Sequence, residues 1–119
     1  MVTTLCMVPL SSDYIKNAAN EHLAFCMEHE TPPQVNQLAA KLRMSPSDFS
    51  DRFLELTGER PSEYLKRHQI EAAKRVLTET SLTMNAIAYS CAFGTRKTFY
   101  RAFKQREGVT PEVYRLANR

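Results

Sequence analysis

The residues best suited to chemistry in this sequence are basic side chains crowded between positions 95 and 106. This stretch holds five bases and no acid, and Arg96, Lys97, Arg101 and Lys104 are interleaved with aromatic residues. An arginine can give two parallel hydrogen bonds to O6 and N7 of guanine, and a lysine can meet a base acceptor or a phosphate. The residue types therefore favour binding to an acceptor-rich, negatively charged partner such as nucleic acid.

Catalytic chemistry has little support. Serines, histidines and acids occur without a nucleophile elbow, a glycine-rich phosphate loop or a cluster of metal ligands. His22, Cys26 and His29 share one helical face at i, i+4 and i+7, but a structural zinc needs a fourth ligand, and Cys26 also continues an apolar stripe. His68 stands alone on a long helix and is expected to be structural. We expect no enzyme activity, no metal and no cofactor.

Composition describes a small folded chain with an uneven charge. Of its 119 residues 43% are hydrophobic, and no stretch has the apolar length that crosses a bilayer. Residues 1–30 carry one base and four acids, whereas residues 31–119 carry fifteen bases and nine acids, a balance compatible with a nucleic-acid partner. Cys6, Cys26 and Cys91 are odd in number and set among apolar residues, which favours buried thiols in a reducing compartment, the cytoplasm.

The chain contains one structural unit twice. With a shift of 50 residues, identical residue types coincide: Phe49 with Phe99, Phe53 with Phe103, Gly58 with Gly108, Pro61 with Pro111 and Tyr64 with Tyr114. With a shift of 49, Leu38 and Ala39 fall on Ile87 and Ala88, and Met44 falls on Phe93. The aromatic spacing of i and i+4 is helical, and sustained strand alternation is absent.

These patterns predict an all-α fold of about seven helices. Helix starts are marked by capping residues and proline, as in Thr31-Pro32-Pro33-Gln34, Ser45-Pro46 and Thr110-Pro111. The expected helices span residues 12–29, 33–42, 46–57, 61–79, 83–91, 95–106 and 111–117. A short helix, a turn and a longer helix is the helix-turn-helix arrangement, predicted at 33–57 and 83–106. Residues 1–11 are expected to be a linker or truncated leader, 12–60 and 80–119 the two helix-turn-helix subdomains, and 61–79 a connector helix.

The length of the connector suits a spacer between two grooves of DNA. Nineteen residues from Pro61 to Glu79 make a helix about 28 Å long. Successive major-groove faces on one side of B-DNA are about 34 Å apart. Modest bending of the DNA would absorb the difference.

The stretch FGTRKTFYRAFK at residues 93–104, followed by Gly108, Thr110-Pro111, Tyr114 and Arg115, resembles the signature of the AraC/XylS family of bacterial transcription regulators. Leu38-Ala39, Met44-Ser45, Phe49, Phe53, Thr57-Gly58 and residues 61–64 are similar to the first unit of that family, so the likeness covers about residues 13–117. It implies seven helices, with two recognition helices in successive major grooves of an asymmetric promoter. In many members a separate sensor domain precedes this module, so the chain is expected to be either an excised C-terminal domain or a stand-alone member. We expect RNA polymerase as a further partner, and a sensor domain or dimer partner in the intact protein.

By position in the motif, the resemblance implies base contacts from Arg96, Lys97, Tyr100, Arg101, Ser47, Ser50 and Asp51. Phosphate contacts are expected from Lys104 and, beside helix N-termini whose amides attract anions, from Gln34, Thr83 and Asn85. Tyr100 is expected to point outward, where it either touches DNA or is solvated. The charged residues of the connector are either phosphate contacts or a solvated face: Lys66, Arg67, Lys74 and Arg75.

The first recognition helix departs from the basic pattern of the second. From Ser45 to Glu55 the net charge is −2, because three acids accompany a single arginine. Carboxylates repel phosphates, so we expect the second unit to anchor binding. The first unit either contributes weakly or reads a cytosine N4 amine through Asp51.

Two further positions depart from the family pattern. Ala92 stands where the family usually turns on glycine, and Gln69 stands where the connector usually has arginine. A left-handed conformation costs alanine about 1 kcal/mol or more, so a strained turn is predicted in the second unit.

A protein-interaction module is the main alternative to a DNA-binding one. In that interpretation the helical pairs bind another regulator or the polymerase, and the acidic first recognition helix is the feature that favours it. Steep weakening of DNA binding by salt would separate the two functions, because it reports phosphate contacts.

Overall fold

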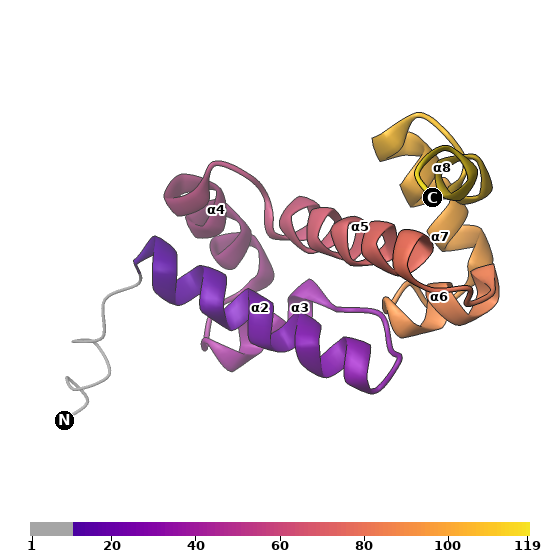
Figure 1. The fold of residues 1–119 in the computed structure, drawn as a ribbon. Coiled ribbons are helices and arrows are strands. Elements are labelled where there is room, and N and C mark those ends of the chain that lie inside the picture. The colour runs from indigo at the N-terminus through magenta and orange to yellow at the C-terminus, as the bar shows by residue number, and fades with distance from the viewer. Residues whose placement is uncertain (1–10) are drawn as a thin grey trace, which may run out of the picture.

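The computed structural model describes residues 11–119, and these form seven α-helices with no strand among them. The helices are α2 (Ser12–Glu28), α3 (Val35–Lys41), α4 (Pro46–Thr57), α5 (Pro61–Glu79), α6 (Met84–Ser90), α7 (Arg96–Glu107) and α8 (Pro111–Ala117). In Figure 1, α5 occupies the middle of the molecule, with α2, α3 and α4 toward one end and α6, α7 and α8 at the other. The predicted all-α fold with a connector helix is confirmed. Cys6 and nearly all of the expected leader lie outside the described residues.

The two units are alike down to their aromatic contacts. The rings of Phe53 and Tyr64 are 5.2 Å apart at an interplanar angle of 69°, and those of Phe103 and Tyr114 are 5.5 Å apart at 71°. Phe49, Phe53 and their counterparts in the second unit are completely buried. The 50-residue repeat of the sequence is therefore a repeat of packing as well as of residue type. No helix within residues 11–119 combines the length and the apolar character that a membrane crossing requires.

The connector α5 belongs to both hydrophobic cores. Tyr64 and Leu65, near its start, join the core of the first unit, whereas Ile70, Ala73 and Leu77, further along, join the core of the second. Because side chains of one rigid helix are packed into both cores, neither unit can rotate about the connector without exposing apolar surface. The relative direction of the two units is thus set by burial.

The start of α3 differs from the prediction. Thr31 does not cap this helix, which begins at Val35 after Gln34, and Gln34 makes no capping bond with its side chain. Thr31 instead ends α2: its N–H donates to the Cys26 carbonyl at 2.9 Å, next to Glu30 in the left-handed region at φ 54°. This bond closes the C-terminus of α2 and leaves the prolines in the loop. The predicted caps at Ser45 and Thr110 are confirmed.

A buried histidine holds the loop that leads into α3. Nε2 of His22 accepts a hydrogen bond from the Gln34 N–H at 3.1 Å, which requires a neutral ring. Burial, and secondarily the charge of Lys41, lowers the pKa of His22. The neutral His22 ring therefore stabilises the folded state fully above about pH 6.5, the ordinary imidazole pKa. This contribution to the free energy of unfolding is lost as the pH falls from there toward the lower pKa of the folded state.

We therefore expect the free energy of unfolding to fall between pH 7.5 and pH 5 through His22. The measurement is urea unfolding at several pH values, comparing the wild type with His22→Gln, which keeps an uncharged acceptor. The variant should lose less stability over this range. His68, whose pKa is also lowered by burial, contributes separately and is tested by His68→Gln. Parallel curves for wild type and His22→Gln would contradict the role given to His22.

Both helix-turn-helix turns place a non-glycine residue in the left-handed region. Arg43 has φ 59° and Ala92 has φ 64°, at equivalent positions of the repeat. The strain predicted at Ala92 is confirmed. Gln69 of α5 lies against this turn, and its side-chain Nε2 donates to the carbonyls of Cys91 at 3.0 Å and Ala92 at 2.9 Å. The glutamine thus satisfies two buried carbonyls at the strained corner and ties it to the connector.

A direct contact joins the two units beside α5. A Cβ built on Gly94 would lie 2.8 Å from Cγ of Pro32, which belongs to the loop between α2 and α3. Gly94 also has φ +87°. The absence of a side chain at this position therefore lets the first unit approach the turn of the second.

Gly94→Ala is expected to destabilise the fold more than the same change at the other glycines. Gly58 and Gly108 have similar φ values, +89° and +82°, but a Cβ there meets no atom within 4 Å. Alanine at those two positions should cost about 1–2 kcal/mol in backbone strain. At Gly94 the overlap with Pro32 should add about 1 kcal/mol or more, measured by urea unfolding.

The matched rescue is Pro32→Ala in the Gly94→Ala background. This change removes the clashing Cγ and should recover the part of the free energy of unfolding that the overlap costs. Equal destabilisation by alanine at all three glycines would show that the contact between units is loose.

Candidate nucleic-acid interface

Helix α7 presents an exposed basic side. Its phenylalanines and Ala102 are buried, and five exposed bases occupy its surface: Arg96, Lys97, Arg101, Lys104 and Arg106. Thr95 caps the helix by accepting the Thr98 N–H at 3.1 Å. Lys97, Arg101 and Lys104 form no ion pair within residues 11–119. Their charges are therefore available to an anionic partner.

Tyr100 differs from the outward position expected of it. Its ring is half-buried against the second core, and its hydroxyl donates to the Glu112 carboxylate of α8. The Arg96 guanidinium lies over the ring at 5.0 Å from the centroid, and its Nη2 donates to the Tyr100 hydroxyl at 3.1 Å. Burial, followed by Glu112, raises the pKa of Tyr100, so the phenol stays protonated. A DNA contact from Tyr100 stays a prediction, but its ring and hydroxyl already position Arg96.

On α4, two of the three predicted base-reading residues, Ser50 and Asp51, are brought together with a further residue, Arg60. Ser47 and Asp51 are exposed and Ser50 is half-buried. Nη1 of Arg60 donates to Oγ of Ser50 and to Oδ1 of Asp51, both at 3.0 Å. Sequence reasoning missed Arg60 because no helical spacing links it to α4. The chain reverses at Gly58, whose left-handed φ of 89° ends α4, and this reversal returns Arg60 to the helix surface.

The predicted phosphate-contacting residues occupy several elements. Lys104 is exposed on α7, and Asn85 is exposed in the first turn of α6. The Thr83 hydroxyl accepts the Ala86 N–H at 3.1 Å as the cap of α6, which leaves its own hydrogen for another acceptor. Gln34 is exposed, but its backbone N–H is committed to His22. One backbone N–H fewer is therefore available at the start of α3 to bind a phosphate.

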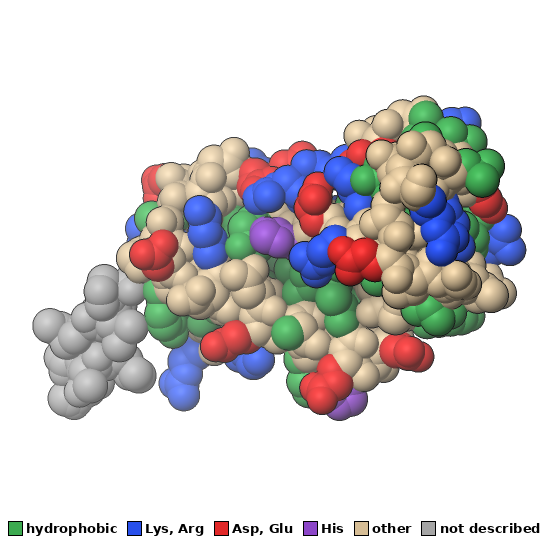
Figure 2. Space-filling view, viewed as in Figure 1, with side chains coloured by type: hydrophobic (Ala, Val, Ile, Leu, Met, Phe, Trp, Pro, Cys, Tyr) green, Lys and Arg blue, Asp and Glu red, His purple; other side chains and the backbone are tan. Residues whose placement is uncertain are grey.

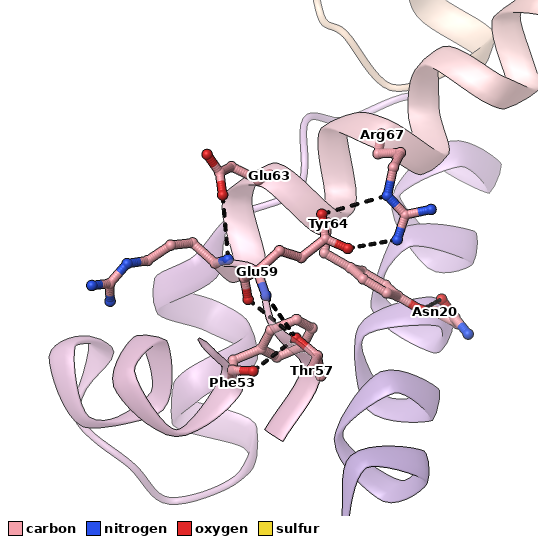
Figure 3. A network of polar contacts seen from close by, with 8 residues as sticks. Asn20, Phe53, Thr57, Glu59, Glu63, Tyr64 and Arg67 are labelled. Atoms are coloured by element: carbon pink, nitrogen blue, oxygen red, sulfur yellow. Dashed lines mark hydrogen bonds and ion pairs between the residues drawn. The ribbon is translucent and has the colours of Figure 1, made fainter. Parts of the chain in front are cut away.

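The bases of the connector fall into two groups. Arg67 holds Glu59 with Nη2 at 2.5 Å and Nε at 3.4 Å, as Figure 3 shows, and Lys74 lies 3.4 Å from both Glu71 and Glu107. The Arg67 guanidinium lowers the pKa of Glu59. Lys66 and Arg75, by contrast, form no ion pair within the described residues. On the face drawn in Figure 2, basic side chains lie along the middle of the molecule and over the second unit, interleaved with acids.

A hollow separates the two units on the side of α7. It is lined by apolar residues of the loop before α3 and by polar residues of α5 and α7, among them Ser62, Lys66, Arg101 and Gln105. Lys66 also lines a neighbouring hollow with Arg106. Of the four connector bases, Lys66 is therefore the one placed beside the exposed side of α7.

The three residues with metal-ligand spacing on α2 do not converge. Nε2 of His22 is occupied by the Gln34 amide and lies 3.6 Å from the buried Sγ of Cys26. His29 is exposed, stacks on Phe25 at 4.1 Å and bonds the carbonyl of that residue. Within the part of the chain that the structure describes, no group of three metal-ligating side chains is present.

Comparison with known proteins agrees with this architecture. A family model described as a helix-turn-helix domain matches residues 38–117. A putative AraC-like transcription regulator of Streptomyces antibioticus is 38% identical over 81 residues, which cover 68% of this chain and 27% of that protein. The chain belongs to the AraC-type helix-turn-helix family.

Other transcription regulators resemble the chain in sequence and in fold. The HTH-type transcriptional regulator Rv1931c of Mycobacterium tuberculosis is 43% identical over 84 residues, or 71% of this chain and 32% of that protein. The DNA-binding domain of AdpA, crystallised with a target DNA, superposes with a TM-score of 0.72 at 30% identity, covering 83% of this chain and 90% of that one. The C-terminal domain of the response regulator yesN from Fusobacterium nucleatum gives 0.77 at 27% identity, with coverage of 87% and 95%. The chain spans about a third or less of the curated relatives it matches.

Proposed function

We propose that this chain is the DNA-binding module of a bacterial transcription regulator, and that α4 and α7 enter successive major grooves of promoter DNA. The observation that carries the proposal is the congruent pair of units on one shared helix, each with the polar side of its second helix exposed. The 19 residues of α5 span about 28 Å, close to the roughly 34 Å between grooves. The similarity to a domain crystallised with its target DNA supports this use of the fold.

In the second unit, Arg96, Lys97 and Arg101 are the base-contacting residues and Lys104 contacts phosphate. Lys66 joins Lys104, because it lies in the hollow beside Arg101 and has no acid paired with it. Phosphate contacts bring most of the affinity and base contacts the sequence preference. The second unit therefore supplies most of the electrostatic attraction.

In the first unit, α4 turns Ser47, Ser50 and Asp51 toward the neighbouring groove, and Gln34, Thr83 and Asn85 lie near phosphates at the rims of the two sites. Binding at a promoter places the intact protein in the cytoplasm, with RNA polymerase as a further partner. A sensor domain or a second copy would supply regulation, in keeping with the greater length of the relatives.

The test is selection of bound fragments from bacterial genomic DNA, followed by fluorescence anisotropy on the enriched site at 50–200 mM salt. Affinity should fall by about 3.5-fold over this range for each phosphate that a lysine or arginine neutralises, so Lys66 and Lys104 alone should lower it by about ten-fold. The double variant Lys97→Glu, Arg101→Glu, changed only at exposed positions, is the control. Enrichment by this variant equal to that of the wild type would refute the proposal.

Protein docking is the second candidate, because the exposed surface of α4 carries Asp48, Asp51 and Glu55. An acidic helix suits a basic protein surface better than a phosphate backbone. A chain that selects no DNA but still binds a polymerase subunit in pull-down assays would favour this function.

A further inference from the structure

The guanidinium of Arg60 lies on the surface of α4, among the residues predicted to read DNA. Arg60 precedes α5 and is not part of the recognition helix. Its Nη1 is 3.0 Å from both Ser50 Oγ and Asp51 Oδ1, and its side chain remains 46% exposed. Two of the three predicted reading residues of the first unit thus hold an arginine from outside their own helix.

The geometry leaves one edge of this guanidinium open. A guanidinium has five N–H donors, and the two bonds to Ser50 and Asp51 both come from Nη1. The donors of Nε and Nη2 have no hydrogen-bond partner within residues 11–119. Nε and Nη2 form the edge with which Arg67 holds both carboxylate oxygens of Glu59. Arg60 therefore keeps Nε and Nη2 free within the described residues, the same two donors with which Arg67 binds both oxygens of a carboxylate.

The backbone of Arg60 is also held. Its N–H donates to Oε1 of Glu63 at 3.4 Å, and its carbonyl accepts the Tyr64 N–H at 2.9 Å. With the main chain and Nη1 both anchored, little rotamer freedom remains to be lost when the open edge meets a ligand. The side chain is arranged for a specific contact in advance of binding.

Charge explains why Asp51 is better placed to hold Arg60 than to read a base. An isolated carboxylate on α4 would face phosphates and be repelled by them. Paired with Arg60 at 3.0 Å, its charge is partly compensated, and the guanidinium, 46% exposed, keeps donors open beside it. The second unit also has an ion pair between its recognition helix and a later residue, with the charges interchanged. There the base, Arg96, lies on α7, and the acid, Glu112, lies on α8 at 3.5 Å.

We propose that Arg60 reads a guanine in the major groove entered by α4, through Nε and Nη2 to O6 and N7, with Asp51 and Ser50 as positioning residues. This inference rests on the proposed function, because it requires α4 to enter a groove. Guanine is favoured over phosphate because Ser50 and Asp51, which hold the guanidinium, occupy positions of α4 at which the family resemblance predicts base contacts. The two-donor edge matches the acceptor pair of guanine.

The test uses the full chain and its selected site, with each base pair of the first half-site replaced in turn. Wild type, Arg60→Gln, Arg60→Lys and Asp51→Asn are compared by anisotropy. The matched control is Arg52→Gln, which removes one exposed arginine from α4 itself, where it pairs with Glu55 at 3.7 Å. Circular dichroism melting verifies that each variant is folded, which the exposure of Arg60 favours.

The wild type should lose affinity by about 5- to 150-fold when one particular G·C pair is replaced. Arg60→Gln and Arg60→Lys should bind the original site more weakly by a similar factor and become indifferent at that pair. Asp51→Asn should weaken the preference for this G·C pair without creating a preference at another position. Arg52→Gln should keep the preference of the wild type.

Two outcomes would overturn the inference. Uniform weakening by Arg60→Gln, with every base preference intact and a shallower salt dependence, would show a phosphate contact. If Asp51→Asn abolished a preference for cytosine while Arg60→Gln kept it, Asp51 would be the residue that contacts the base. Failure of the wild type and of Arg52→Gln to bind any selected DNA would instead refute the proposed function itself.

Discussion

Replacing Gln69 by glutamate is expected to lower the stability of the fold by about 3–5 kcal/mol at neutral pH. The Gln69 side chain is 6% exposed, and its Nε2 donates to the carbonyls of Cys91 and Ala92. A carboxylate in this place would set a buried charge against two carbonyl oxygens, with no donor to compensate it. The turn at Ala92, already strained at φ 64°, would lose the bonds that hold it to α5.

The effect should depend on pH in a definite direction. Burial raises the pKa of the introduced glutamate above its unfolded value of about 4.3, so the penalty is absent below that pH and grows as the pH rises toward the folded-state value. The variant should therefore approach the wild type in acid. Urea unfolding between pH 4 and pH 7.5 measures this, with the wild type correcting for the other titrating groups.

Gln69→Leu is the matched control, because it removes the hydrogen bonds without adding charge. It should cost about 1–3 kcal/mol at every pH, the penalty of leaving buried carbonyls without donors. Hydrogen exchange should show faster opening in α6 and α7 than in α2 and α4, because Gln69 contacts the second unit. Equal loss in both units, or a glutamate variant as stable as the wild type at pH 7, would show that the turn does not depend on this residue.

Arg101→Ala is expected to weaken binding to a selected site by about 5- to 150-fold, the range for loss of a bidentate base contact. Arg101 is exposed on α7, lines the hollow between the units and has no acid paired with it in the described residues. Asp51→Ala should weaken binding by less than about five-fold. Loss of positioning for Arg60 is partly offset there by removal of a charge that repels phosphate.

The comparison is made by anisotropy at 100 mM salt, with Lys16→Ala on α2 as a control for the loss of one positive charge outside the reading helices. The control should leave affinity within about two-fold of the wild type. Equal losses from Arg101→Ala and Asp51→Ala would remove the proposed difference between the two units.

The helices and their repeat could be predicted because they depend on neighbours in sequence. Ser45 and Thr110 cap helices through bonds to residues three positions away, and phenylalanines four apart define one buried side. The exception, Thr31, shows the limit of such reasoning. A threonine before two prolines is typical of a helix start, yet its amide was needed to close the preceding helix.

The amino-acid sequence by itself determined that this chain forms two copies of one helical pair and that residues 95–106 carry an excess of positive charge, because spacing, capping and charge are local properties. Only the tertiary structure decided which polar groups meet. Arg60 reaches Asp51 because the chain reverses at Gly58, and Gln69 reaches Ala92 because α5 is packed into both cores. These pairs lie 9 and 23 residues apart, and their meeting depends on chain reversals and on the burial of apolar surface that aligns the helices.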